Sequence, residues 1–406
     1  MNALEQPGFG RRLKAMRLAR GLSQRSLAGD GMSTGYLSRL ESGARPPTKQ
    51  AVAYLAERLG VSPAEFRETE TPSLARAIAE ASYGETPEAV TVLDKLVATA
   101  SDEDPALLWQ AHWILAEAKR RHGDHEAEAG YLHRLVELSD EPAVPELQVR
   151  ARTQLARCRR TLGEMEEARA LAAEALGIAR ENGLSVSDVA AALLVLVSAE
   201  AETGRVPDAR AHADELRELV GGASGTLQVQ ALWVAATVCV RQGDYATAQE
   251  LLQEALGRLD SRDDILLWMR LRLAAASLSL QLPVPRTEAA AAWLDEAEPA
   301  VGLVGEPQHR QQLEALRAHL AFSQGRPEQA RALYDSVHAS DLRLSFRDQV
   351  KLEVLHNRLL IHEGRRSEGI AGLRTLAQQV HESSNLDLAA EIWRILADHL
   401  AEPSDR

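Results

Sequence analysis

The chain has 406 residues, enough for two or three domains, and its 45% apolar and 26% charged residues are ordinary for a soluble globular protein. Its formal net charge of −13 argues against a protein that binds nucleic acid over its whole surface. The only two cysteines, Cys158 and Cys239, lie far apart in apolar helical runs, which argues against a disulfide framework and predicts two buried thiols. No apolar run reaches the roughly 20 residues of a membrane span, so a cytoplasmic location without membrane contact is expected.

The charge is unevenly distributed along the chain. Residues 1–50 hold nine Lys or Arg and three Asp or Glu, a local charge of +6, which leaves −19 for the other 356 residues. Because exposed charges are screened beyond about 8–10 Å, a basic segment can attract a phosphate backbone that the rest of the chain repels. The distribution predicts one nucleic-acid docking face near the N-terminus.

Five short helices are predicted in and just after this basic segment. The first covers residues 9–19, with its apolar side chains at helical spacing: Phe9, Leu13, Met16 and Leu18. Ser23 and Ser33 are good N-caps for a second and a third helix, and the glycines of residues 29–31 predict a tight turn between them. Two further helices, over 49–60 and 61–66, offer core residues Val52, Leu55, Leu59 and Phe66.

The third helix, residues 34–42, is expected to bury Leu37 and Leu40 and to keep its other face polar. Two short helices joined by a tight turn, the second polar outside, suit insertion into a major groove about 12 Å wide. The segments that carry a family resemblance are "LSQ" (22–24), "LA" (27–28), "GMS" (31–33), "YLSRLESG" (36–43), Pro46 and "LAERLGVSP" (55–63). Together they resemble the Cro/CI-type helix-turn-helix, or Xre family, over residues 9–67. The segment between Leu27 and Ser33 is about one residue shorter than the commonest family spacing.

The resemblance implies which residues meet DNA. Thr34, Gly35 and Arg39 take base-facing positions, and the guanidinium of Arg39 can donate two hydrogen bonds to a guanine. The implied set of DNA-contacting residues is Gln24, Ser33, Thr34, Gly35, Tyr36, Ser38, Arg39 and Arg45. In this set Gln24 meets a phosphate, Tyr36 and Ser38 lie beside the backbone, and Arg45 suits a phosphate or a narrow minor groove. The resemblance also implies a structural pair between Arg17 and Glu41. The alternative is a charged, solvated face on a small helical domain.

Internal repeats organise the rest of the chain. Glycines recur at 84, 123, 163, 204, 243, 325 and 364, in steps of 39, 40, 41, 39, 82 and 39, where 82 is two periods. The repeat without its glycine has "QLPVPR" (281–286) in that place. An alanine often follows five residues after the glycine, as at Ala89, Ala168, Ala209, Ala248 and Ala330. Such a glycine ends one helix, and the alanine allows the next helix to pack closely.

These copies resemble tetratricopeptide repeats. The resemblance implies an all-α protein, in which the head domain is followed by a right-handed solenoid of seven helix pairs and a terminal helix over 386–400. Each repeat is expected to touch only its neighbours. The predicted domains are residues 1–70, which bind DNA, and residues 74–406, which bind an effector and dimerise, with a linker at 67–73 that contains Pro72.

A solenoid of this kind commonly binds a peptide or a helix in its concave groove. Projection onto the repeat pattern places ten residues there: Trp113, Glu117, Arg150, Gln154, Arg157, Trp233, Thr237, His319, Lys351 and Arg358. The basic run "RARTQLARCRR" (150–160) can anchor a carboxylate or another anion, or it can be a solvated face that pairs with "GEMEEA" (163–168). Trp113 and Trp233 can equally serve packing between repeats.

No enzyme motif is present. The chain has no GxxxxGK[ST], GxGxxG or HExxH pattern, and residues 121–133 show no arrangement typical of zinc ligands. We therefore expect no catalytic residue, no metal site and no cofactor.

The combined architecture resembles bacterial regulators of the RRNPP class, whose repeats sense a short signalling peptide. This implies a homodimeric transcription regulator in quorum sensing that reads a pseudo-palindromic operator in double-stranded DNA and responds to a peptide effector. One alternative is a regulator that senses a non-peptide small molecule. Another is an interaction scaffold in which the repeats recruit a protein and DNA binding is weak.

Overall fold

The structure is a computed structural model that describes residues 6, 8–66, 73–84, 86–100, 103–141, 143–222 and 225–401. The chain is all-α, and the described residues contain no strand. It divides into two compact units, residues 1–77 and 78–406, and the division lies inside helix α5 (Leu74–Gly84). Most of the predicted linker, residues 67–72 with Pro72, lies outside the described residues.

Before α5, the described part of the first unit has four α-helices and one turn of 3₁₀ helix. They are α1 (Gly8–Ala19), α2 (Gln24–Ala28), α3 (Thr34–Glu41), α4 (Lys49–Leu59) and η1 (Pro63–Phe66). Ser23, Ser33 and Thr48 cap α2, α3 and α4, because each side chain accepts a hydrogen bond from a backbone N–H of the first turn. The predicted helix over 61–66 shortens to the 3₁₀ turn η1.

The core of the first unit holds the predicted apolar residues with one exception. Phe9, Leu13, Leu37 and Leu40 are fully buried, and Phe66 packs with its ring centre 5.3 Å from that of Phe9. Leu18, although apolar and near the helical spacing of Phe9 and Leu13, is 57% exposed. Its neighbour Arg17 is buried instead, because the Arg17 side chain reaches Glu41 on α3.

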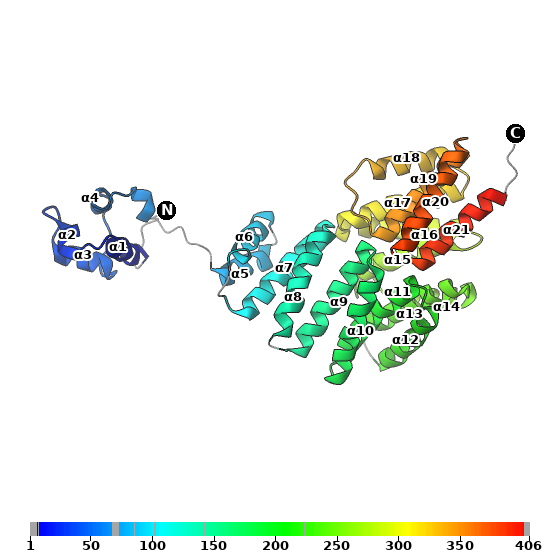
Figure 1. Ribbon diagram of the computed structural model, residues 1–406, viewed down its shortest axis with the longest axis horizontal. Coiled ribbons are helices and arrows are strands. Elements are labelled where there is room, and N and C mark those ends of the chain that lie inside the picture. Colours follow the sequence, from blue (N-terminus) through cyan, green and yellow to red (C-terminus); the bar gives the residue numbers. More distant parts are fainter. Residues whose placement is uncertain are drawn as a thin grey trace. The chain divides into compact units, whose positions relative to one another are not determined.

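The second unit is a series of antiparallel helix pairs (Figure 1). After α5 its helices are α6 (Pro87–Val97), α7 (Pro105–His122), α8 (His125–Asp140), α9 (Pro145–Leu162), α10 (Met165–Glu181), α11 (Val186–Glu202), α12 (Val206–Leu219), η2 (Val220–Gly222), α13 (Gly225–Gln242), α14 (Tyr245–Arg258), α15 (Ile265–Gln281), α16 (Thr287–Val304), α17 (Pro307–Ser323), α18 (Pro327–His338), α19 (Phe346–His362), α20 (Arg366–Glu382) and α21 (Leu386–Ala401). The prediction of seven pairs was wrong by one. The described residues contain eight, from α5 and α6 to α19 and α20, before the terminal helix α21.

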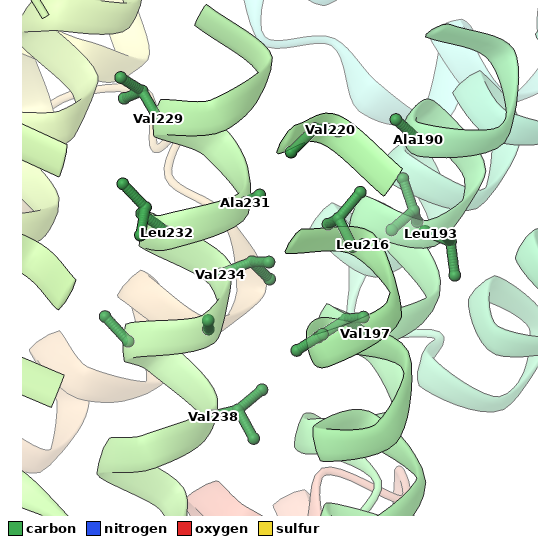
Figure 2. Packing of buried hydrophobic residues seen from close by; sticks show 14 of the residues in the cluster. Ala190, Leu193, Val197, Leu216, Val220, Val229, Ala231, Leu232, Val234 and Val238 are labelled. Carbon is green, nitrogen blue, oxygen red and sulfur yellow. The ribbon is translucent and has the colours of Figure 1, made fainter. Parts of the chain in front are cut away.

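Most of the repeated glycines and alanines have the roles that the pattern predicts, but Ala89 is only half-buried. Six of the glycines have the left-handed φ that ends a helix: 123, 163, 204, 243, 325 and 364. The alanines at 168, 209, 248 and 330 are buried where the second helix of a pair packs against the first. Figure 2 shows the core this creates between α11, α12 and α13, where Leu193, Val197, Leu216 and Val238 interdigitate.

Contacts between distant helices close the array on itself. Helix α7 lies against α17, α9 against α19 and α11 against α21. The fully buried Asn385 donates from Nδ2 to the carbonyl oxygen of Gly163, 222 residues earlier in the sequence, at 3.0 Å. Glycine is required at this turn, because the ring of Phe346 packs so closely that a Cβ on Gly163 would lie 2.6 Å from it. The expectation that each repeat touches only its neighbours was therefore wrong, because α17, α19 and α21 lie against helices of much earlier repeats.

A group of buried ion pairs, the closure cluster, lies at these contacts. It consists of Arg160, Glu202, Arg241, Arg347 and Asp387, one each from α9, α11, α13, α19 and α21. Arg241 Nε lies 2.7 Å and Arg347 Nη2 2.5 Å from Asp387 Oδ2, and Arg160 Nε lies 3.0 Å from Glu202 Oε2. Burial by itself raises the pKa of Asp387, but the charges of Arg347 and Arg241 outweigh it, and the pKa is lowered. Asp387 is thus an anion at the centre of the closure.

Candidate nucleic-acid interface and effector face

Helix α3 presents a polar face to solvent. The Ser33 hydroxyl accepts from the Tyr36 N–H at 3.1 Å and fixes the start of the helix. With Leu37 and Leu40 fully buried below, the residues left exposed are Thr34, Gly35, Ser38 and Arg39. No atom lies within 4 Å of the place where a Cβ on Gly35 would stand, so glycine is not required there by packing.

Helix α4 supports the short turn between α2 and α3. The Tyr54 hydroxyl donates to the Ala28 carbonyl at 2.7 Å and accepts from the Gly31 N–H at 3.2 Å, while Arg58 Nε donates to the Leu27 carbonyl at 3.2 Å. Gly31 is needed here, because a Cβ would lie 2.5 Å from the Tyr54 ring. Sequence reasoning missed Tyr54 and Arg58, since nothing in their local pattern shows that they reach back to this turn.

The pair between Arg17 and Glu41 is present. Arg17 donates from Nε and Nη2 to the two carboxylate oxygens of Glu41, at 2.6 and 3.0 Å. Burial by itself raises the pKa of Glu41, but hydrogen bonds from Arg17 and Gln24 outweigh it, and the pKa is lowered. Arg17 is thereby a structural cation rather than a DNA contact.

Two of the predicted DNA contacts are held by other side chains of the head. Gln24 donates from Nε2 to Glu41 Oε2 at 2.8 Å, which fixes its amide at the start of α2. The exposed Arg45 places its guanidinium carbon 4.9 Å from the ring centre of Tyr36, and its backbone N–H donates to the Arg39 carbonyl at 3.2 Å. Arg45 and Tyr36 are therefore neighbours beside the exposed face of α3.

The predicted effector residues all lie on the first helices of their pairs. Trp113 and Glu117 are on α7, Trp233 and Thr237 are on α13, and the others are on α9 (Arg150, Gln154, Arg157), α17 (His319) and α19 (Lys351, Arg358). We call the face on which they are predicted to lie the inner face. Some are engaged within their own helix, since Glu117 pairs with Arg120 at 3.2 Å and the Thr237 hydroxyl donates to the Trp233 carbonyl at 3.1 Å.

Aromatic rings and arginines adjoin on the inner face. The rings of Trp109 and Trp113 stack with their centres 5.3 Å apart, and the Arg150 guanidinium lies 5.9 Å from the Trp113 ring centre. The Arg270 guanidinium, on α15, lies 5.8 Å from the ring centre of Trp233. Both tryptophans are half-buried, so each combines packing with a face that a ligand can reach.

The basic run of α9 divides into two groups. Arg159 pairs with Glu164 and Glu167 at 2.6 and 3.1 Å, and Arg152 pairs with Asp140 and Glu174, both at 2.9 Å. Arg159 therefore fits the interpretation as a face that pairs with residues 163–168, whereas Arg152 is buried and pairs elsewhere. Arg157 differs, because its hydrogen bond goes to the neutral Gln154 at 3.2 Å.

Four arginines gather on the inner face around Arg157. This arginine cluster comprises Arg120, Arg157, Arg160 and Arg270, from α7, α9 and α15. Burial and the charges of Arg270 and Arg160 lower the pKa of Arg157 to about 10. Burial and the charges of Arg120 and Arg160 also lower the pKa of Arg270, although its side chain is exposed to water. Exposure combined with partial loss of hydration is expected of a side chain inside an open concavity. Among the described residues no carboxylate pairs with Arg157 or Arg270, and sequence reasoning missed Arg270 because its repeat lacks the glycine.

The three predicted residues of α17 and α19 form a second group. Burial and the positive charges of Lys351 and Arg358 lower the pKa of His319 to about 3, so this imidazole is neutral. Lys351 Nζ lies 3.4 Å from the hydroxyl of Ser277 on α15, and the Arg358 guanidinium lies 4.5 Å from the Phe322 ring centre. The inner face is thus positive on α19 as well as on α9.

Two cavities lie away from these residues. One of about 260 Å³ is lined by residues of α6, α7 and α8 that include Asp94, His112 and Tyr131. The other, of about 490 Å³, lies between the turn at Gly123 and residues 341–343. No helix among the described residues is long and apolar enough to cross a membrane.

Comparison with known proteins supports both units. Residues 9–69 match a helix-turn-helix domain, and residues 188–261 match a tetratricopeptide repeat. The chain is a helix-turn-helix domain followed by tetratricopeptide-like repeats. No curated protein matches the sequence.

Several solved structures resemble the chain at low identity. A Rap protein complexed with Competence and Sporulation Factor is 11% identical, with a TM-score of 0.52 over 97% of this chain and 98% of that chain, and shows the same repeat fold. PlcR of Bacillus thuringiensis, in complex with the peptide PapR7 and DNA, is 14% identical over 75% of this chain and 98% of its own, with a TM-score of 0.41. The apo quorum sensor NprR from B. thuringiensis is 13% identical over 80% and 97%, with a TM-score of 0.44.

Proposed function

We propose that the protein is a sequence-specific, DNA-binding transcription regulator of the Xre type, not an enzyme, whose repeats bind an effector. The observation that carries the DNA half is α3, which buries Leu37 and Leu40 and leaves Thr34, Gly35, Ser38 and Arg39 free for a major groove. A scaffold without DNA binding has no need of this face. Because one such helix covers few base pairs, the active species is a homodimer on a pseudo-palindromic operator.

For the effector we propose a short peptide, bound on the inner face. The support is the arginine cluster, in which Arg157 and Arg270 have no carboxylate partner and can receive the terminal carboxylate of a peptide. The Rap protein of similar fold was solved with a bound factor, which is consistent with an effector here. A non-peptide anion remains the alternative, and the tests below separate the two.

The DNA proposal is tested by substitutions at two arginines. Arg39→Ala should cost about 1–3 kcal/mol on the operator and relax preference at one base pair per half-site. Arg45→Ala should weaken binding to all sequences alike and reduce the salt dependence by about 0.9 in the log–log slope. Operator and random duplexes titrated at several salt concentrations, with light scattering for the dimer, measure these effects. Salt-independent binding, or a monomer with a single half-site footprint, contradicts the proposal.

The effector proposal is tested by operator affinity with and without the molecule that mass spectrometry identifies in the purified protein. Arg157→Glu should abolish the response and leave effector-free operator binding unchanged. Arg159→Glu is the matched control, because it makes the same charge change on the same helix at an arginine already paired with Glu164 and Glu167. A peptide or a non-peptide identity decides between the two effector classes. An equal response in the wild type and Arg157→Glu excludes this site.

A further inference from the structure

Three side chains capable of binding a metal meet between α8 and α9. His125 and Glu128 lie one turn apart at the start of α8, and His125 Nδ1 is 2.8 Å from Glu128 Oε2. Cys158 faces them from α9, and its thiol donates to the backbone carbonyl of His125 at 3.2 Å. The ligand atoms of the three residues all lie within 4.8 Å of one another. This group belongs neither to the head nor to the arginine cluster.

The internal repeats show that Glu128 is exceptional. Five residues after the turn glycine, four other repeats have a buried alanine: Ala168, Ala209, Ala248 and Ala330. Five residues after Gly123 stands Glu128, which is only 6% exposed. A carboxylate at a position of close helix packing is costly unless a cation accompanies it. Packing alone therefore does not account for this residue.

No lysine or arginine pairs directly with this carboxylate. Among the described residues none forms an ion pair with Glu128, and the basic group beside it is the imidazole of His125, at 2.8 Å. We propose that His125, Glu128 and Cys158 bind one divalent transition-metal ion, of which zinc is the first candidate. Thiolate, imidazole and carboxylate are the ligands that zinc prefers, and three protein ligands leave a fourth position for water.

Charge balance favours the proposal. Without metal, the Cys158 thiol carries its proton, since it donates to the carbonyl oxygen of His125. On binding, the thiol releases that proton to solvent, and the sulfur donates its electron pair to the ion. One thiolate and one carboxylate then neutralise a divalent ion, and the buried charge of Glu128 is compensated. The His125 side chain is 14% exposed and gives the ion a way in.

Such an ion would fasten the first turn of α8 to α9. This turn follows Gly123, where a Cβ would lie 2.9 Å from Arg343, and Arg343 hydrogen-bonds the carbonyl oxygen of His122. The metal would thus stabilise the turn that residues 341–343, between α18 and α19, contact. Spacing along the chain conceals the site, since Cys158 comes 30 residues after Glu128.

The test is a titration of the full-length, chelator-treated protein with Co²⁺, followed by displacement with Zn²⁺. We expect one Co²⁺ per chain and a near-ultraviolet thiolate-to-cobalt charge-transfer band that Zn²⁺ abolishes. Cys158→Ser should lose the band. Cys239→Ser is the matched control, because Cys239 is equally buried but does not belong to the proposed site. Its Sγ lies 3.5 Å from Nη1 of Arg210. His125→Ala and Glu128→Gln should each weaken binding at least 10-fold, the smallest loss expected even for an outer-shell partner.

Three results overturn the proposal: no band in the wild type, an equal band in Cys158→Ser, or binding that is unchanged in both His125→Ala and Glu128→Gln. Circular dichroism establishes that each variant is folded. Thermal unfolding of the wild type with and without one equivalent of Zn²⁺ needs no substitution and gives an independent readout. Zinc should raise the Tm of the wild type and of Cys239→Ser, and an unchanged wild-type Tm contradicts a site formed only in the fold.

Discussion

At the scale of single residues, buried ion pairs determine how the head depends on pH. The side chains of Arg17 and Glu41 are 9% and 3% exposed, and Gln24 adds a third hydrogen bond to the same carboxylate. Since all three residues join α1, α2 and α3, this carboxylate connects the helices that form the DNA-binding face. Removal of one member of a buried pair leaves the other charge without compensation.

We predict that Glu41→Gln destabilises the head by about 3–5 kcal/mol at neutral pH. The pKa of Glu41 is lowered in the fold, so its contribution is present above the unfolded value of about 4.5 and is lost as the pH falls through the folded value. Wild-type stability should therefore decline in acid below about pH 4.5, and the Gln variant should decline less. Hydrogen exchange of peptides from residues 9–45 in the full chain measures this. A parallel decline in both proteins contradicts it.

At the scale of elements, two glycines of the head show opposite requirements. A Cβ on Gly10 would lie 2.3 Å from the Leu40 carbonyl oxygen, because α1 and α3 are in close contact there, whereas Gly35 faces open space. Gly10→Ala should cost about 1–3 kcal/mol, since backbone atoms must move apart. Gly35→Ala should stabilise α3 by about 0.5–1 kcal/mol. Urea unfolding followed by the tyrosines and by operator binding distinguishes them, and equal effects of the two substitutions contradict this assignment.

The elements themselves were largely predictable, and their distant partners were not. Caps at Ser23 and Ser33 and glycines near every fortieth residue are local signals, and they gave the helix boundaries and the helix pairs. The positions of Tyr54, Arg58 and Arg270 depend on contacts with residues far along the chain, for which a single sequence has no periodic signal. The effector residues were predicted from the rule that a repeat projects one position of every copy to the same side, and they stay a prediction. Which arginines stay unpaired depends on neighbours such as Glu164, which a repeat pattern does not give.

At the scale of the whole molecule, closure of the repeats offers a route for regulation. An effector on the arginine cluster lies beside Arg160, which also belongs to the closure cluster through Glu202. Binding that draws Arg160 or Arg120 toward a ligand competes with their pairs to Glu202 and Glu306. We predict that the effector thereby selects between a closed and a more open array. Operator and effector affinities must change each other by the same factor, typically about 5- to 150-fold.

The closure cluster gives a matched pair of variants on α21. Asp387→Asn should destabilise the repeats by about 3–5 kcal/mol, because it leaves Arg241 and Arg347 buried without their shared anion. Asp398→Asn should change stability by less than about 1 kcal/mol, since its pair with Arg394 is exposed. Denaturant unfolding, with hydrogen exchange at α9 and α21, provides the measurement. If both substitutions cost the same, the cluster does not hold the array closed.

The hydrogen bond between Asn385 and Gly163 also has a consequence for synthesis on the ribosome. Its two partners are separated by 222 residues, which at about 5–20 residues per second corresponds to roughly 10–40 s of translation. Until Phe346 and Arg347 are synthesised, the nascent chain exposes the turn at Gly163 and the acidic end of α11, which these two residues contact in the fold. The early repeats therefore lack these contacts until the last helix is made. A chain whose synthesis stops before α21 is a natural substrate for chaperones and proteases.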